Sequence, residues 1–174
     1  MVRPPWEPYE ETRGWAVLEL EPGRAFGTGL HETTSLVAEA LAGARALLAG
    51  VTVLDAGCGS GILALVALLL GAARARAVDN DPIAIEVTRE NAERNGLAAR
   101  VEADTTDIAA LADRYPVVVA NIETSVLVPM APDLVARVAP GGLLVLSGIL
   151  ASQADAVVEA YRALTPAGRG ARGE

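Results

Sequence analysis

The sequence contains no lysine, so all 14 basic residues of this 174-residue chain are arginines. Without a lysine the chain cannot form a Schiff base through an ε-amino group, and it cannot build a Walker-type phosphate loop. A single cysteine, Cys58, excludes an internal disulfide. Because His31 is the only histidine, no cluster of histidine and cysteine predicts a metal site.

Net positive charge and long apolar runs are missing as well. The chain carries 22 acidic residues and a formal charge of −8, and no basic stripe predicts nucleic-acid binding. Its longest apolar run, residues 62–73, is too short to cross a bilayer of about 30 Å as a helix, and residues 1–10 contain no apolar secretion signal. We therefore expect a cytoplasmic protein without a membrane segment, in which the run forms a buried helix.

Apolar strands and helical patterns alternate along the chain, at a composition of 52% hydrophobic and 21% charged residues that is typical of globular proteins. The expected strands are 15–20, 51–56, 75–79, 99–104, 117–121 and 143–149, and the expected helices are 32–49, 60–70, 82–95, 124–138 and 152–164. Near-continuous apolar strands separated by helices predict a parallel sheet covered on both faces. With right-handed crossovers this is a doubly wound α/β fold, which binds ligands at the carboxyl ends of its strands.

One domain is expected at residues 15–164, after an N-terminal segment or linker at 1–14 and before a Gly/Arg-rich tail at 165–174 that we expect to be disordered. Asp81 is the expected N-cap of the helix that begins at Pro82. In the expected sheet the last strand, 143–149, leaves one edge open. An open edge predicts a homodimer or a covering N-terminal segment.

A glycine-rich turn, in the stretch "VLDAGCGSG", connects an apolar strand to the helix that follows. Its alternating Gly57, Gly59 and Gly61 let the backbone turn sharply and approach a ligand closely. The spacing does not fit the dinucleotide fingerprint, because Ile62 stands three residues after Gly59. With Asp55 in front, the pattern resembles motif I of the class I S-adenosylmethionine-dependent methyltransferases. The resemblance implies a Rossmann-like fold in which Asp55 and the three glycines hold the methionine end of S-adenosyl-L-methionine.

Polar residues end the other strands of the expected sheet. Asp79, with Asn80 beside it, stands where an acidic side chain accepts both ribose hydroxyls in nucleotide-binding folds. Asp104 ends the next strand, where methyltransferases often contact the adenine amino group, and a solvated loop aspartate is an equally good interpretation. Asn121 ends the strand "VVVAN", where an amide either orients the substrate or simply terminates the strand.

Several longer stretches together resemble one narrower family, the bacterial PrmA-type ribosomal protein methyltransferases, over about residues 15–164. They are "PGRAFGTGLHETT", "VLDAGCGSGILAL", "AVDNDPIAIEVTRENAERNG", "VVVANI" and "PGGLLVLSGILASQADAV". The resemblance implies methylation of amino groups on a protein of the large ribosomal subunit. It implies cofactor contacts at Thr34, Gly57, Asp79 and Asn121, and it places Thr28 in the loop over the active site. Asn121 and Thr28 are thus the candidate catalytic residues.

Departures from the family pattern keep other functions open. Only residues 1–14 precede the first strand, where the family has a substrate-recognition domain, and the chain ends in "GRGARGE", where the family continues the sheet. Pro116 replaces an aspartate that is usual in the family. The alternatives are a cofactor-binding module without independent catalysis, a small-molecule methyltransferase and, last, a NAD-binding oxidoreductase. For His31 we prefer a structural role over a role as general base.

Overall fold

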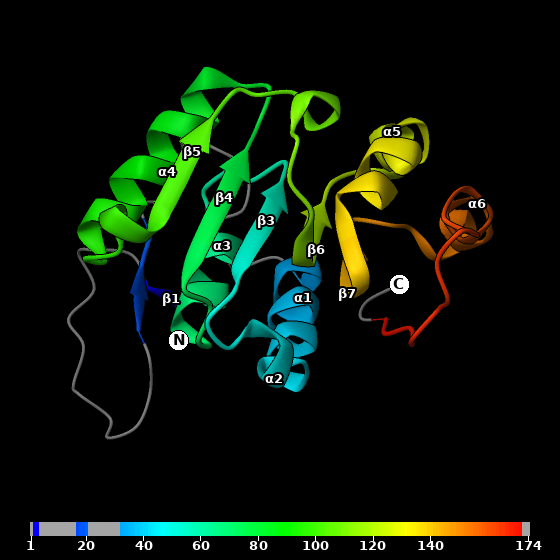
Figure 1. The fold of residues 1–174 in the computed structure, drawn as a ribbon, viewed down its shortest axis with the longest axis horizontal. Coiled ribbons are helices and arrows are strands. Elements are labelled where there is room, and N and C mark those ends of the chain that lie inside the picture. The colour runs from blue at the N-terminus through cyan, green and yellow to red at the C-terminus, as the bar shows by residue number, and fades with distance from the viewer. Residues whose placement is uncertain (1, 4–16, 21–31, 172–174) are drawn as a thin grey trace.

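The computed structural model describes residues 2–3, 17–20 and 32–171 (Figure 1). Its helices are α1 (Glu32–Gly43), α2 (Arg45–Leu48), α3 (Ile62–Leu69), α4 (Pro82–Arg94), α5 (Thr124–Arg137) and α6 (Ala154–Ala160), with short 3-10 turns at Ala98–Arg100, Ile108–Ala110 and Ala151–Gln153. Its strands are β1 (Val2–Arg3), β2 (Leu18–Glu19), β3 (Thr52–Ala56), β4 (Arg74–Val78), β5 (Val101–Asp104), β6 (Tyr115–Asn121) and β7 (Val138–Ser147).

Five parallel strands form the central sheet, in the order β5-β4-β3-β6-β7 (Figure 1). β3 pairs with β4 on one side and with β6 on the other, so the direction of winding reverses between β3 and β6. The predicted doubly wound α/β fold is therefore confirmed. The carboxyl ends of β3 and β6 meet at the switch point, where such a sheet binds its ligands. β1 and β2 form a separate parallel pair.

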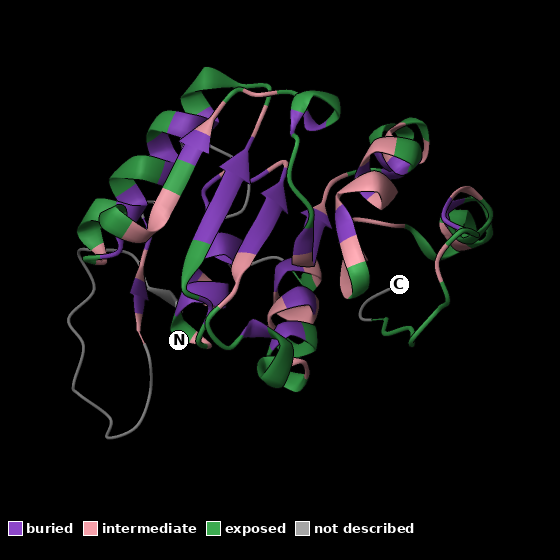
Figure 2. Ribbon diagram, in the orientation of Figure 1, coloured by how far each residue is buried: buried purple, intermediate pink, exposed green. Residues whose placement is uncertain are grey.

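Alternating side chains of the central strands build two hydrophobic cores, one on each face of the sheet. Val53 and Val119 face α1, α3 and α4, whereas Leu54 and Val118 face α5 and α6. Figure 2 shows β3, β4 and β6 buried over most of their length. The covering of the second face is incomplete, because the connection from β5 to β6 holds only the 3-10 turn Ile108–Ala110 in place of a helix.

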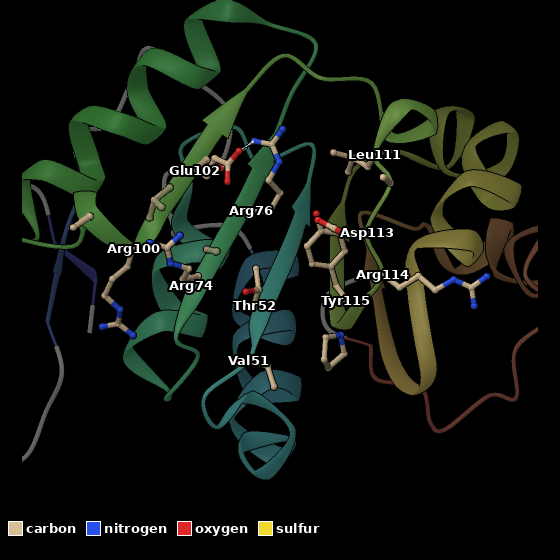
Figure 3. A pocket seen from close by; sticks show the side chains of 15 residues that line it. Val51, Thr52, Arg74, Arg76, Arg100, Glu102, Leu111, Asp113, Arg114 and Tyr115 are labelled. Atoms are coloured by element: carbon tan, nitrogen blue, oxygen red, sulfur yellow. Dashed lines mark hydrogen bonds and ion pairs between the residues drawn. The ribbon is translucent and has the colours of Figure 1, made fainter.

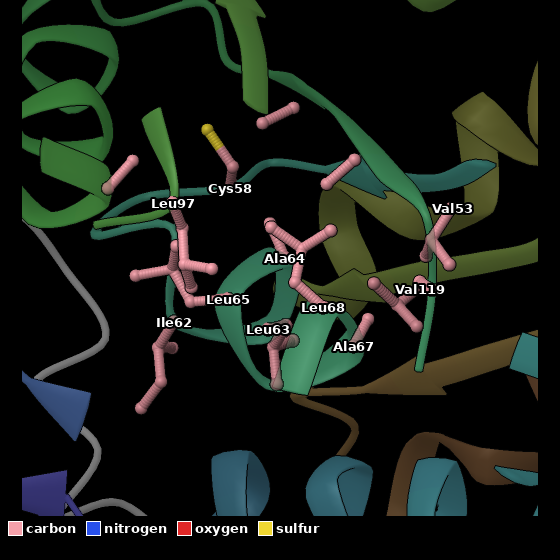
Figure 4. Packing of buried hydrophobic residues seen from close by; sticks show 14 of the residues in the cluster. Val53, Cys58, Ile62, Leu63, Ala64, Leu65, Ala67, Leu68, Leu97 and Val119 are labelled. Carbon is pink, nitrogen blue, oxygen red and sulfur yellow. The ribbon is translucent and has the colours of Figure 1, made fainter. Parts of the chain in front are cut away.

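The first eight residues of the apolar run 62–73 form α3, the buried helix that was predicted. Its side chains pack between the sheet and α1 (Figure 4), and Leu63, Ala64, Leu65 and Leu68 are at most 4% exposed. A helix that is apolar on nearly every side is stable only when it is enclosed in this way. The first core therefore forms around α3.

The structure corrects several of the predicted boundaries. The expected helix 152–164 is a 3-10 turn at Ala151–Gln153 followed by α6, which ends at Ala160, and the expected helix 60–70 covers only Ile62–Leu69. The expected helix 32–49 is interrupted at Ala44, between α1 and α2. The expected strand 143–149 pairs regularly from Leu143, but β7 already begins at Val138. The register between β6 and β7 shifts next to Pro116, which has no N–H to donate and is tolerated where a ladder is irregular.

The ends of the domain remain partly untested. Of the expected strand 15–20, residues 15 and 16 lie outside the described residues. Residues 165–171 are exposed and have no regular secondary structure. In the described part of the chain no strand pairs with the outer edge of β7, and the expected dimer or covering segment stays a prediction. Among the same residues no helix is long and apolar enough to span a membrane.

Two leucines of α3 test whether this helix is the centre of the first core. Leu65 is 0% exposed and Leu69 is 37% exposed. We expect Leu65→Ala to lower the free energy of unfolding by about 2–5 kcal/mol, because it removes apolar contacts and leaves a cavity. The matched variant Leu69→Ala should cost less than about 1 kcal/mol. Urea denaturation measures both values, and equal losses would contradict the assignment.

Candidate functional site

The glycine-rich turn after β3 is held by backbone hydrogen bonds to the end of β4. The amides of Gly57 and Cys58 donate to the carbonyl of Val78, at 2.8 and 3.1 Å, and the amide of Gly61 donates back to Cys58 at 2.8 Å. Gly57, Gly59 and Gly61 have φ angles of 70°, 54° and 77°, in the left-handed region that favours glycine. The turn therefore needs glycine for its conformation.

Space around the turn also requires glycine at Gly57. A Cβ atom there would lie 2.5 Å from Cγ2 of Ile122, the residue that follows β6. A Cβ atom at Gly148, after β7, would lie 2.6 Å from the carbonyl oxygen of Ile122. The loops after β3, β6 and β7 thus converge on Ile122. The motifs "ANI" and "SGI" were noted in the sequence, but their contribution to this packing was not predicted.

Two polar side chains of α4 donate hydrogen bonds to carbonyls of the turn. The Thr88 hydroxyl donates to the Gly59 carbonyl at 3.0 Å, and the Asn91 amide donates to the Ser60 carbonyl at 2.9 Å. Both side chains are at most 1% exposed. Sequence reasoning missed them, although polar residues three apart on the apolar face of a helix are an available signal.

Asp79 lies directly after β4 and fixes the turn from the other side. Its Oδ2 accepts the Gly59 amide at 2.9 Å and its Oδ1 accepts the Asp81 amide at 3.0 Å. An ionised carboxylate has about four acceptor positions, so about two remain for a ligand. Asp81 caps α4 as predicted, since its side chain accepts the amide of Ile83 at 2.9 Å. Asn80 is exposed between them.

Asp55 lies under the turn and is 1% exposed. Its Oδ2 accepts the amide of Ala64, in the first turn of α3, at 2.9 Å, while its Oδ1 has no partner among the described residues. Burial raises the pKa of Asp55 from its ordinary value of 3.8 to about 7, against the opposing hydrogen bond from Ala64, and the charge of Asp79 adds to the rise. Burial likewise raises the pKa of the Cys58 thiol, which leaves it protonated and unreactive.

The ends of β6 and β7 hold the first turn of α1. The Asn121 amide nitrogen donates to the hydroxyl of Thr34 at 3.4 Å, and the Ser147 hydroxyl donates to the carbonyl of Thr33 at 3.2 Å. Thr34 is 2% exposed and Asn121 is half-buried. The structure thus brings together two residues that lie 87 positions apart in the sequence. Thr28, like His31, lies outside the described residues.

Asp104, at the end of β5, is next to Asp79 through a backbone hydrogen bond of 3.4 Å. Its Oδ1 accepts the guanidinium of Arg76 at 2.7 Å and the amide of Thr106 at 2.8 Å. The hydrogen bond from Arg76 lowers the pKa of Asp104 well below its usual range, and Thr106 adds to this effect. Arg76 was not predicted as a site residue.

The family sequence model of the ribosomal protein L11 methyltransferases (PrmA) matches residues 1–166 of the chain. The chain belongs to this family. The ribosomal protein L11 methyltransferase of Sorangium cellulosum is 58% identical over 164 residues, which are 94% of this chain and 52% of that protein. The crystal structure of the ribosomal protein L11 methylase from Lactobacillus delbrueckii subsp. bulgaricus has a TM-score of 0.83 at 30% identity, over 93% of this chain and 82% of that one.

The PrmA family assignment confirms the resemblance seen in the motifs. A more distant structure, a methyltransferase from Geobacter sulfurreducens in complex with S-adenosyl-L-homocysteine, shares the fold at 23% identity and a TM-score of 0.56, over 68% of this chain and 51% of that one. The chain spans about half the length of the curated PrmA relatives it matches.

The candidate site is thus the edge of the central sheet at the carboxyl ends of its strands, which carries several hydrogen-bond acceptors. Asp79, Asp104 and Asn121 lie at the ends of three strands, and the glycine turn lies between them. Within residues 2–3, 17–20 and 32–171, no three metal-ligating side chains gather. The edge offers carboxylate and amide oxygens to a ligand that carries hydroxyl, amino or cationic groups.

Buried Asp55 makes stability depend on pH. Its pKa rises on folding, so the folded chain holds this proton more tightly than the unfolded chain between about pH 4 and pH 7. The free energy of unfolding should therefore fall as the pH rises through this window, by up to about 4 kcal/mol from this group. Asp55→Asn should remove that part of the slope.

Urea denaturation of the wild-type chain and of Asp55→Asn at a series of pH values tests this. The stability of the variant relative to the wild type should rise between pH 4 and pH 8, whatever the constant cost of the substitution. Parallel curves for the two proteins would show that Asp55 does not titrate there.

Proposed function

We propose that this chain binds S-adenosyl-L-methionine at the carboxyl ends of β3, β4 and β6 and transfers its methyl group to amino groups of ribosomal protein L11. The observation that carries the proposal is the glycine turn, which is tied to Asp79 and lies beside Asn121 at the switch point of the sheet. A ribosomal acceptor places the reaction in the cytoplasm. The net charge of −8 favours association with a basic partner protein.

The residues present fit this cofactor. Asp79 keeps about two free acceptor positions for the two ribose hydroxyls, because each of its oxygens accepts only one backbone amide. Gly57 and Gly59 are half-buried and have no side chain that would keep the methionine end from the backbone. The carboxylates of Asp79 and Asp104 favour the cationic ammonium and sulfonium groups.

The turn is held in place by three side chains that do not contact the cofactor, namely Asp55, Thr88 and Asn91. Asp55 is too deeply buried to touch a ligand, and it holds the start of α3 through the amide of Ala64. Thr88 and Asn91 fix the carbonyls of the turn. We therefore give these three residues and buried Gly61 a positioning role, while half-buried Gly57, Gly59 and Asp79 form the contact surface.

When bound, the cofactor supplies an electrophilic methyl group on a sulfonium. The acceptor amine attacks the methyl carbon with its lone pair, and the electrons of the breaking S–C bond stay on sulfur. The amine must first lose a proton to solvent water, and a free lysine amine has a pKa of about 10.4. Burial next to the sheet edge lowers this pKa, because it disfavours the charged form. The chain then contributes orientation rather than a strong base.

Asn121 is the residue that orients the acceptor. Its amide nitrogen donates to Thr34, which fixes the plane of the amide and leaves Oδ1 to accept an N–H of the incoming amine. Such a contact points the lone pair of the nitrogen toward the methyl group. Thr34 therefore acts on the acceptor through Asn121. Thr28, which precedes α1 in the sequence, stays a candidate catalytic residue.

Cofactor binding is tested with two neighbouring aspartates. We expect Asp79→Asn to weaken binding of S-adenosyl-L-homocysteine at least roughly tenfold, because it removes the charged acceptor of the ribose hydroxyls. The matched variant Asp81→Asn should bind within about twofold of the wild type, since asparagine caps a helix as well as aspartate does. Calorimetric titration measures both affinities. Equal losses, or none, would contradict the ribose assignment.

Transfer is tested with Asn121→Ala. At saturating cofactor the rate of methyl transfer to purified ribosomal protein L11 should fall about 100-fold, because the acceptor is no longer oriented. The assay follows tritium from labelled S-adenosyl-L-methionine into the protein. An unchanged rate would remove Asn121 from the site. Cofactor binding without transfer by the wild-type chain would instead favour a binding module without independent catalysis.

A further inference from the structure

Arg76 is a buried charged residue in the middle of β4. Its side chain is only 10% exposed, although it lines a hollow of about 550 Å³ on the second face of the sheet (Figure 3). The guanidinium Nη2 donates to Asp104 Oδ1 at 2.7 Å, and Nη1 donates to the Glu102 carbonyl at 3.4 Å. A buried guanidinium of this kind is retained only where its donors are satisfied.

Asp104 is the main partner of Arg76. The Glu102 carboxylate lies 3.6 Å from Arg76, but its side chain is 72% exposed, and exposed ion pairs contribute little. The Asp104 side chain is 40% exposed and forms the shorter contact. Arg100 also lines the hollow, and it donates to the carbonyls of Leu68 and Ala73 instead of to a carboxylate. The pair of Arg76 and Asp104 therefore joins the hollow to the carboxyl end of β5.

Of the two carboxylate oxygens of Asp104, Oδ1 accepts the hydrogen bond from Arg76, and Oδ2 does not take part in the pair. Oδ1 accepts both Arg76 and the amide of Thr106, from two directions, so the carboxylate cannot rotate without breaking a bond. Oδ2 accepts no hydrogen bond in the described part of the chain. The backbone carbonyl of Asp104 accepts the amide of Asp79, the proposed ribose residue, so Asp104 lies beside the nucleoside end of the site.

We infer that Arg76 is a positioning residue of the cofactor site, which holds the Asp104 carboxylate fixed so that its Oδ2 accepts a hydrogen bond from the 6-amino group of the adenine. This inference rests on the proposed function. Arg76 itself does not touch the cofactor. Its removal leaves the Asp104 carboxylate held by Thr106 alone and free to rotate, so recognition of the amino group is weakened while the rest of the site stays in place.

The test compares two ligands on each protein by calorimetry: S-adenosyl-L-homocysteine and its analogue with hydrogen in place of the 6-amino group. The wild type should bind the amino form roughly tenfold more tightly or better, as expected for a hydrogen bond to a charged acceptor. In Arg76→Gln this ratio should fall at least roughly threefold, and the affinity for the 6-hydrogen analogue should change less than about twofold. A general loss of structure would weaken both ligands equally.

Two control variants isolate the pair. Arg74→Gln removes the same charge from the same strand, two residues earlier, at an exposed position that is not bonded to Asp104. Glu102→Gln removes the exposed partner of Arg76. Both should keep the wild-type ratio. If Arg76→Gln does not fold, Arg76→Lys is the deciding variant. A lysine ammonium has no planar fork that could hold both the Asp104 carboxylate and the Glu102 carbonyl. The ratio of the two ligand affinities should therefore still fall at least roughly twofold.

The outcomes separate the inference from the proposed function. If the wild type binds neither ligand, the cofactor proposal fails. If it binds both ligands equally, or if the variants of Arg76 keep the wild-type ratio, cofactor binding stands and the role of Arg76 is overturned. A ratio that falls in Arg74→Gln as much as in Arg76→Gln also overturns it, because the effect would then be one of net charge.

Discussion

The hydrogen bond from the Gly59 amide to the Asp79 carboxylate joins the turn after β3 to the end of β4, and the other parts of the site are arranged around it. The turn can make this bond because Gly57, Gly59 and Gly61 occupy left-handed conformations. The same turn sets the first residue of α3, and through Gly57 it receives Ile122 from the loop after β6. One local backbone conformation thus brings three strand ends to a common edge.

The surrounding layers stabilise that conformation. Thr88 and Asn91 of α4 donate hydrogen bonds to two carbonyls of the turn, and the loss of a donor to a buried carbonyl is costly. Asp55 secures the start of α3, at the cost of burying a carboxyl group of which one oxygen has no partner among the residues that the structure describes. The apolar packing of α3 against the sheet offsets this cost. Site and core therefore depend on each other: α3 is both the centre of the first core and one wall of the site.

Local signals in the sequence were sufficient for the order of the elements and for the glycine turn, because apolar periodicity and an Asp-Pro helix start act over a few residues. The boundary of β7 was missed because its early start depends on an irregular register beside Pro116. Arg76, Thr88 and Asn91 were missed for a similar reason: their partners lie 28 to 31 positions away. Asn121 and Thr34 were placed in one site only by resemblance, since no spacing rule connects residues so far apart.

A crystal structure of the protein grown with S-adenosyl-L-homocysteine would locate the cofactor on the sheet edge. We expect density at the carboxyl ends of β3 and β4, with the ribose hydroxyls about 3 Å from the Asp79 carboxylate and the homocysteine chain along Gly57 and Gly59. Density in the hollow lined by Arg74, Arg76 and Arg100, or a ribose that does not contact Asp79, would contradict the proposed site.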